Sequence, residues 1–519
     1  MCRYRGAGHS KLIQTVARAG GRAWAARREL VARGVAAMGT ALLWLAGPHP
    51  AQTHGSSRWA RPAEWRTLGR RCRPDRCSGD GIVLGWLGRF LLETPREDNL
   101  LLLGVQRSGK TSSIIVPTLL GWSGAVLATS TKEELVQLTA RQRARRGPVH
   151  VFAPLDRDSD WIRALGLSAA RWNPLAGTLD VAAAAELASH FTHPGRGRSP
   201  DHWYLAAASL MTALMAMESR RGADLRAVLS RLNSLRPDQY IALAATCGHP
   251  AIAELLAAHG NTPEREAGSV ASTARSCLSL WIDDRIAAAT GPGPNQLDLD
   301  QLLAEGGSLY LVAPAEEAER CRPLFSALLM RLLRCATMRA RQQHGSLSPR
   351  LLLALDEAAN FARIPRLAGY ASTGPGQGIQ LLLGFHDLAQ IEHVYGREEA
   401  RTIWNNCRAR ILLPGQGDLI TLDHFSRAMG EQTRVYSVGR GDRLRPARSE
   451  QRLARPLCSI DELRRSKRAV LLYAGAHPAQ MVLRRWDQVA DWRSLVESGP
   501  PIDPAPDRPT TSQEVFEWN

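Results

Sequence analysis

The sequence predicts an α/β fold with a twisted, mostly parallel sheet and an inserted all-α domain, and three patterns support this prediction. Residues 99–120 combine a short aliphatic run, a loop with two glycines and a segment suited to a helix. Aliphatic runs alternate with helical patterns before residue 178 and after residue 302, whereas residues 179–301 show helical patterns alone. The chain of 519 residues, 44% of them hydrophobic, can form a large core and is long for a single domain.

The loop at residues 104–111, GVQRSGKT, has the spacing of a phosphate-binding loop. Its glycines let successive backbone N–H groups turn toward phosphate oxygens, and the following helix offers its positive N-terminal end. Lys110 would contact the β- and γ-phosphates of ATP, and the Thr111 hydroxyl would bind Mg²⁺. A chance match has odds of roughly one in a few hundred, because the chain has only four lysines. The predicted nucleotide-binding residues are Gly104, Val105, Gln106, Arg107, Ser108, Gly109, Lys110, Thr111 and Ser112.

Two further strands complete the first half of the predicted core. Residues 125–129 (AVLAT) and 150–153 are short apolar runs, and the segment between them has helical spacing with a glycine stop at Gly147. The segment RWNPL, residues 171–175, ends this half. Strands that are apolar throughout and alternate with helices indicate a parallel sheet covered on both faces.

The middle of the chain, residues 179–301, has alanine- and leucine-rich segments at helical spacing, separated by the breaks PGRGRSP and GHP. We interpret it as an inserted all-α domain. Strand patterns return at residues 308–312, a helix is expected at residues 322–341, and the aliphatic run LLLALDE follows at residues 351–357.

The run LLLALDE places two carboxylates at the end of a predicted strand. Asp356 and Glu357 would lie at the carboxyl edge of the sheet, where the phosphate loop also opens. Asp356 would hold Mg²⁺ through its water shell, and Glu357 would activate the attacking water as general base. Alone, such a run is more often a strand end beside a solvated turn, and the upstream phosphate loop favours the catalytic interpretation.

A later strand, residues 379–385, ends at His386, which would lie beside Asp356 and near the γ-phosphate; an ordinary strand-end histidine is the alternative. Residues 409–413 and 470–473 are also predicted strands. Between them, residues 434–456 form an expected Gly/Arg-rich loop, either a nucleic-acid contact or a solvated loop.

Charge is concentrated at the N-terminus. The net charge is +17, and residues 1–80 hold fifteen Lys or Arg against four Asp or Glu. Such an arm can contact nucleic acid or anionic lipid, or can be a poorly ordered terminus of biased composition. Its apolar run at residues 35–47 is too short for a confident spanning helix and favours an interfacial segment. The nine cysteines form no C-x-x-C pair, which fits a reduced, cytosolic-facing chain.

These patterns predict five segments. They are a basic N-terminal arm (1–80), a P-loop ATPase domain in two parts (81–178 and 302–495), the all-α insertion (179–301) and a Pro-rich, disordered tail (496–519).

Several motifs, taken in order, resemble those of the type IV coupling proteins, the TraG/TraD-like ATPases of conjugation and type IV secretion. The resemblance covers roughly residues 80–490 and rests on GVQRSGKT with IIVPTLLGW, TSTKEELV, RWNPL, LDEAANFARIPRLAGYASTGPGQGIQLLLGFHDLAQIEHVYG and ARPLCSIDELRR. It implies a RecA-like motor domain that uses ATP and Mg²⁺, an all-α domain in the insertion and a homo-hexameric ring. The implied partners are single- or double-stranded DNA bound without sequence preference, relaxase or accessory transfer proteins, and components of the secretion channel.

The chain departs from the family pattern in three places. The two N-terminal membrane helices that are usual in the family are reduced here to residues 35–47, so we expect a cytoplasmic protein associated peripherally with the inner membrane. His386 stands where family members often carry Gln, and Pro375 where they often carry an arginine that reaches the neighbouring subunit's nucleotide. A different arginine could take over that role: Arg363, Arg366, Arg408 or Arg410. Two functions therefore stay open, a motor ATPase that drives or licenses nucleoprotein transfer and a hydrolysis-impaired adaptor that binds nucleotide as a switch.

Overall fold

The structure is a computed structural model that describes residues 55–66, 70–72, 79–157, 159–176, 178, 180–192, 202–361, 363–440 and 447–499. The predicted apolar run at residues 35–47, most of the basic arm and nearly all of the C-terminal tail lie outside these residues. Within them, no helix has both the length and the apolar character needed to cross a membrane.

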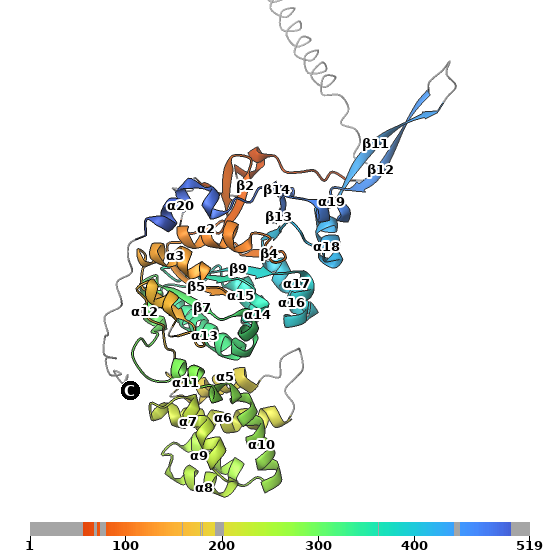
Figure 1. Cartoon of the computed structure of the whole chain (residues 1–519). Helices are drawn as coiled ribbons and strands as arrows, with labels where there is room; N and C mark the ends of the chain where they lie inside the picture. The colour runs from red at the N-terminus through yellow and green to blue at the C-terminus, as the bar shows by residue number, and fades with distance from the viewer. Residues whose placement is uncertain are drawn as a thin grey trace, which may run out of the picture. The chain divides into compact units, whose positions relative to one another are not determined.

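A mostly parallel sheet lies at the centre of the chain (Figure 1). In the described part of the chain it has nine strands, in the order β14-β13-β10-β4-β9-β8-β5-β7-β6. From β10 to β6 each neighbouring pair is parallel, whereas β13 and β14 extend the sheet beyond β10 in antiparallel pairing. The predicted parallel sheet is therefore confirmed. The strands are β4 (Leu100–Leu103), β5 (Ala125–Ser130), β6 (Val149–Phe152), β7 (Ser308–Val312), β8 (Leu351–Leu355), β9 (Ile379–Phe385), β10 (Ala409–Leu412), β13 (Ala469–Tyr473) and β14 (Ala479–Met481).

Helices cover both faces of this sheet, and strand β4 shows why its residues are all apolar. Leu101 and Leu103 point into one core, whereas Leu100 and Leu102 point into the other, and none of the four is exposed. Successive side chains of a strand face opposite sides, so a strand with helices on both faces needs apolar residues throughout. The helices outside the insertion are α2 (Val116–Gly121), α3 (Glu134–Ala144), α4 (Asp160–Ala164), α13 (Ala315–Gln342), α14 (Ala358–Phe361), α15 (Leu367–Thr373), α16 (Leu388–Tyr395), α17 (Arg397–Asn406), α18 (Leu419–Met429), α19 (Ile460–Arg465) and α20 (Ala490–Glu497).

Most of the chain between β6 and β7 forms a cluster of helices, coloured yellow to green in Figure 1. They are α5 (Val181–Thr192), α6 (His202–Arg220), α7 (Leu225–Ser234), α8 (Pro237–Thr246), α9 (Pro250–Gly260), α10 (Glu264–Cys277) and α11 (Asp284–Thr290). The last helix before β7, α12 (Leu299–Ala304), packs against α13. The RWNPL segment joins this cluster to the sheet: Ala170 N, just before it, donates to Val151 O of β6 at 2.8 Å, and Trp172 N donates to Ala289 O of α11 at 3.0 Å. Each bond pairs a backbone N–H group in or beside this segment, which belongs to no named strand or helix.

Two small sheets add to the elements expected from the sequence. β1 (Arg70–Cys72), β3 (Phe90–Glu93) and β2 (Val83–Leu87) form one sheet, and nearby Trp65, which belongs to the predicted arm, is 1% exposed. The predicted Gly/Arg-rich loop is instead the hairpin of β11 (Glu431–Arg440) and β12 (Ala447–Pro456), so that prediction was wrong. The segment's Thr, Val and Tyr residues favour extended backbone, a preference that its arginine content obscured. The hairpin belongs to a second compact unit, in which Ser56 pairs with Gln432.

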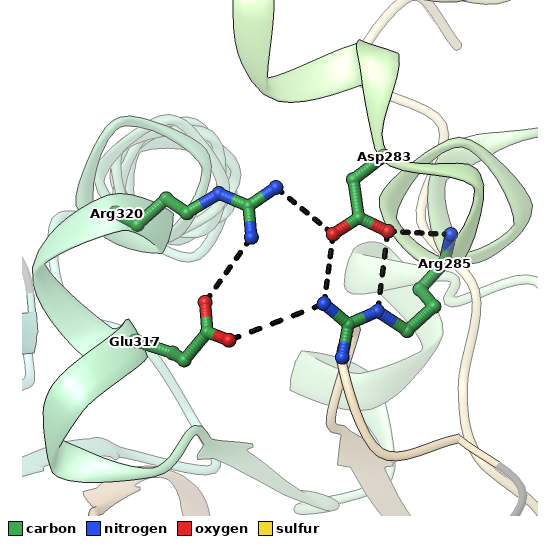
Figure 2. A network of polar contacts seen from close by, with 4 residues as sticks. All are labelled: Asp283, Arg285, Glu317 and Arg320. Atoms are coloured by element: carbon green, nitrogen blue, oxygen red, sulfur yellow. Dashed lines mark hydrogen bonds and ion pairs between the residues drawn. The ribbon is translucent and has the colours of Figure 1, made fainter.

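An ion-pair network joins the helical insertion to the first turn of α13 (Figure 2). Asp283 caps α11 and accepts a hydrogen bond from Arg285 Nη2 at 2.8 Å and one from Arg320 Nη2 at 2.9 Å. Glu317 pairs with Arg320 at 3.2 Å and with Arg285 at 4.0 Å. Arg285, with a further contribution from Arg320, holds the pKa of Asp283 well below its usual range. The network therefore fastens α11 of the insertion to the helix that follows β7.

We expect Asp283→Asn to lower the free energy of unfolding by about 1.5–3 kcal/mol, because a hydrogen-bonded charge is lost between two guanidinium groups. Chemical denaturation monitored by circular dichroism would measure the change. The neighbouring variant Asp284→Asn is the control: its side chain is 87% exposed in its pair with Arg226, so the expected change is within about 0.5 kcal/mol.

The effect of Asp283→Asn should also depend on pH. Since the folded-state pKa of Asp283 is lowered, its stabilising contribution is fully present above the ordinary aspartate pKa of about 4 and is lost as the pH falls toward the lowered value. The difference between wild type and variant should be largest near neutral pH and shrink in acid. A difference that is independent of pH would contradict this account.

Candidate functional site

Three neighbouring strands bring the predicted site residues to one edge of the sheet. β9 lies between β4 and β8, with Leu103 paired to Phe385 and Leu355 paired to Leu383. All three strands are parallel, so their carboxyl ends meet at this edge. The phosphate loop follows β4, His386 follows β9, and Asp356 with Glu357 follows β8. The expected convergence of these segments is observed.

Backbone geometry accounts for the glycines of the loop. Gly104 N donates to Phe385 O at 3.1 Å, and a β-carbon at Gly104 would lie 2.7 Å from Leu413 Cβ, so no larger residue fits. Gly109 has a φ of +94°, a conformation that strains other residues. After the loop the first turn, η3 (Thr111–Ile115), is a wide π turn, a form found often at functional sites. The loop conformation therefore depends on both glycines of the motif.

Lys110 folds back over the loop. Its Nζ donates to Gly104 O and, at 3.3 Å, to Val105 O, and the residue is only 7% exposed. Burial lowers the pKa of the Lys110 amine, and the negative charges of Asp356 and Glu357 oppose this shift. The amino group is thus held beside the backbone that would surround phosphate groups.

Thr111 and Asp356 make direct contact across the edge of the sheet. The Thr111 hydroxyl donates to Asp356 Oδ2, and Thr129 Oγ1 donates to the Asp356 backbone oxygen at 2.9 Å. Asp356 Oδ1 is buried and has no hydrogen-bond partner in the described part of the chain. Burial raises the pKa of Asp356, although the Thr111 hydrogen bond and the Lys110 charge oppose the rise. A hydroxyl beside a carboxylate with an unused oxygen is the kind of donor set that Mg²⁺ prefers, so these residues fit a Mg²⁺ site.

Glu357 follows directly in a left-handed conformation, with a φ of +53°. Few residues other than glycine adopt this conformation, and such strain is common at functional sites. Asn360 Nδ2 donates to Glu357 Oε2 at 3.3 Å. The side chain of Glu357 is half-buried, so it is accessible to a water molecule.

His386 is held through its backbone. Its N–H donates to Gln390 Oε1 at 2.8 Å, and its carbonyl accepts from Gln416 Nε2 at 2.7 Å. The predictions assigned no role to either glutamine, to Thr129 or to Asn360, because no local pattern shows which distant group each of them contacts. Only their position in the fold brings them to the site.

The other loop residues differ in exposure. Gln106 and Arg107 are exposed, whereas Val105, Ser108 and Ser112 are half-buried. The Ser108 hydroxyl oxygen is buried and has no hydrogen-bond partner in the described part of the chain.

Pro375 lies at the opposite edge of the sheet, four residues before β9. Its carbonyl accepts a weak bond of 3.5 Å from Arg350 Nη2. Arg408, one residue before β10, is also at that edge, where it pairs with Asp98 at 3.1 Å. Arg410 lies within β10 with its guanidinium 4.9 Å from the centre of the Trp404 ring. Arg408 and Arg410 therefore do not lie at the edge that carries the phosphate loop, whereas the remaining two, Arg363 and Arg366, come after β8, which ends at that edge.

The sequence is similar to a protein family model and to several characterised proteins. The chain matches the family model of type IV secretory system conjugative DNA transfer over residues 61–486. It is 27% identical over 461 residues to the conjugal transfer protein TraG of Escherichia coli, a match that covers 79% of this chain and 70% of that protein. It is 23% identical over 399 residues to protein VirD4 of Rhizobium rhizogenes, covering 73% of this chain and 57% of the relative.

Solved structures share the fold. The plasmid coupling protein TrwB in complex with ADP and Mg²⁺ superposes with a TM-score of 0.57 at 16% identity, covering 85% of this chain and 96% of that chain. The bacterial conjugative coupling protein TrwBdeltaN70 gives a TM-score of 0.58 at 16% identity, covering 84% and 95%. These likenesses confirm the predicted RecA-like α/β fold.

We expect Lys110→Ala to lower ATP affinity or turnover by about 100-fold or more, because a charged hydrogen-bond donor to phosphate is lost. Equilibrium binding of ATP with Mg²⁺ and a phosphate-release assay would measure both quantities. Lys132→Ala, which removes an exposed lysine 22 residues further on, is the control and should leave both unchanged. A Lys110→Ala protein that binds and turns over ATP normally would refute the phosphate-loop assignment.

Proposed function

The chain belongs to the type IV secretory system conjugative DNA transfer family, and from this premise we propose that it is an ATP-hydrolysing coupling protein. In this proposal it recruits or translocates DNA, as nucleoprotein, to a conjugative secretion channel. The observation that carries the proposal is the meeting of Lys110, Thr111, Asp356, Glu357 and His386 at one edge of three adjacent strands. Such an edge is where α/β sheets bind their ligands.

Each of these residues has a distinct role in the proposed reaction. Lys110 neutralises charge on the β- and γ-phosphates, and the loop backbone orients them. Glu357 accepts a proton from the water that attacks the γ-phosphorus, while His386 contacts the γ-phosphate. Thr111 and Asp356 would hold Mg²⁺, which supplies positive charge to the phosphates when bound. The assignment of ATP and Mg²⁺ draws on TrwB, which has been solved with a non-hydrolysable ATP analogue and with ADP and Mg²⁺.

The proposed assembly is a homo-hexamer that acts on DNA without sequence preference, together with relaxase or accessory transfer proteins and channel components. The family's role in conjugative DNA transfer supports this part of the proposal. In the proposed ring, a neighbouring subunit's nucleotide would face the edge that carries Pro375 and Arg408. Arg408 is the more exposed of the two arginines at β10, which favours it over Arg410 as a residue that acts in trans.

One observation favours the second function, a hydrolysis-impaired adaptor. Pro375 supplies no cation at the position where family members often carry arginine, and its side chain is buried. Without an arginine in trans, hydrolysis would slow by about 10³- to 10⁵-fold. ATP turnover by the purified full-length protein, with and without DNA, separates the two functions.

We expect DNA to stimulate ATP turnover, and Glu357→Gln to reduce that turnover by about 100-fold or more with ATP binding retained. The amide keeps the shape of the side chain but cannot accept a proton. Glu392→Gln, at an exposed position on α16, is the matched control and should behave as wild type. A wild-type protein that binds ATP without turnover under both conditions would instead support the adaptor.

We propose that the protein acts at the cytoplasmic face of the membrane as a peripheral protein. The thirteen apolar residues 35–47 would span roughly 20 Å as a helix, against a hydrocarbon core of about 30 Å. The basic residues that precede them would be attracted to anionic headgroups. Washing membranes with high salt or carbonate should therefore release most of the protein. Release by detergent alone would show that residues 34–57, which contain no Lys, Arg, Asp or Glu, insert into the bilayer.

A further inference from the structure

We propose that Gln416 is a positioning residue that holds His386 at the γ-phosphate position and so lets the site distinguish ATP from ADP. This inference rests on the proposed contact between His386 and the γ-phosphate. Gln416 lies in the loop that connects β10 to α18 and is 2% exposed. A buried side-chain amide is costly unless its hydrogen-bonding groups are paired, and this one is paired on both its nitrogen and its oxygen.

The amide of Gln416 links two loops. Its Nε2 donates to His386 O at 2.7 Å, while its Oε1 accepts from Gly417 N at 2.9 Å and from Asp418 N at 3.1 Å. The oxygen end therefore fixes the glutamine within its own loop, and the nitrogen end fixes the residue after β9. The amide is oriented by donors on one side and an acceptor on the other, so it cannot flip without losing all three bonds.

A second bond strengthens the link two residues further on. Leu388 N donates to Thr421 Oγ1 at 3.0 Å, and the Thr421 hydroxyl donates to Asp418 Oδ2 at 2.7 Å. Thr421 is fully buried. The segment from His386 to Leu388 is thus attached at two points to the β10–α18 connection.

His386 depends on these backbone bonds for its position. In the described part of the chain its imidazole makes no hydrogen bond, so the ring is placed by the backbone that carries it. The two backbone bonds of His386 differ in direction: Gln416 donates to the carbonyl, whereas Gln390 Oε1 accepts from the N–H at 2.8 Å. Because of this difference, replacing glutamine by glutamate removes the bond at Gln416 but keeps the bond at Gln390.

The test replaces each glutamine by glutamate in the full-length protein. Gln416→Glu keeps an oxygen for Gly417 and Asp418 but turns the second oxygen toward the His386 carbonyl, so the donor is lost. Gln390→Glu keeps the acceptor that the His386 N–H needs and is the matched control. The measurements are equilibrium affinities for a non-hydrolysable ATP analogue and for ADP, each with Mg²⁺, together with thermal unfolding.

We expect Gln416→Glu to weaken binding of the ATP analogue by about tenfold with ADP affinity unchanged, since one buried hydrogen bond is worth about that factor. His386→Ala should lose the same discrimination, and the double variant should lose no more than His386→Ala alone. Gln390→Glu should retain it. If Gln416→Glu unfolds, Gln416→Met, which removes the donor without adding a charge, replaces it in the same measurements.

Three results would overturn the proposal. Equal weakening of ADP and of the ATP analogue would show that Gln416 has a structural role alone. Additive losses in the double variant would show that it acts independently of His386. Lost discrimination in His386→Ala but normal discrimination in Gln416→Glu and Gln416→Met would refute the positioning role and leave His386 in place. Normal discrimination in His386→Ala would instead refute the γ-phosphate contact itself, which belongs to the proposed function.

Discussion

The pairing of β9 between β4 and β8 is the constraint on which the rest of this structure depends. Thr111 and Asp356 are 245 positions apart, yet the two strands that carry them are separated by one strand and end at the same edge. The bond from Gly104 N to Phe385 O continues this pairing into the phosphate loop itself. A shift in the register of β9 would therefore move His386 relative to both the loop and the acidic pair.

Charges within the site compensate one another. Lys110 is buried, which disfavours its positive form, and Asp356 is a carboxylate removed from water, which disfavours its negative form. Each lies close enough to the other to oppose the effect of burial. The buried, unpartnered oxygen of Asp356 still carries a desolvation penalty, which a cation at this position would relieve. The site thus combines a strained backbone at Glu357 with a buried, unpaired carboxylate oxygen at Asp356.

The helical insertion is attached to the rest of the chain through polar as well as apolar contacts. Its link to α13 is the network of Asp283, Arg285, Glu317 and Arg320, and its link to the sheet is the RWNPL segment. The network begins in the first turn of the helix that follows β7, two strands away from β8 in the sheet. Apolar packing adds to these polar contacts, because Leu187 of α5 and Leu210 of α6 belong to the same buried core as Leu103 of β4.

Local sequence determined the strand–loop–helix unit of the phosphate loop, the acidic pair after β8 and the helical character of residues 179–301. These features depend on interactions between near neighbours: glycine conformations, apolar runs of strand length and helical periodicity. The order of the strands in the sheet could not be predicted from local sequence, because pairing between distant strands leaves no local pattern. For the same reason Gln416, Thr129 and Asn360 could not be predicted, since single polar residues acquire a role only when another segment is folded against them. The hairpin of β11 and β12 was misjudged because its arginines suggested a solvated loop, while its β-branched and aromatic residues favoured strands. Sequence therefore specified the chemistry of the site, and the tertiary structure decided which residues hold that chemistry in place.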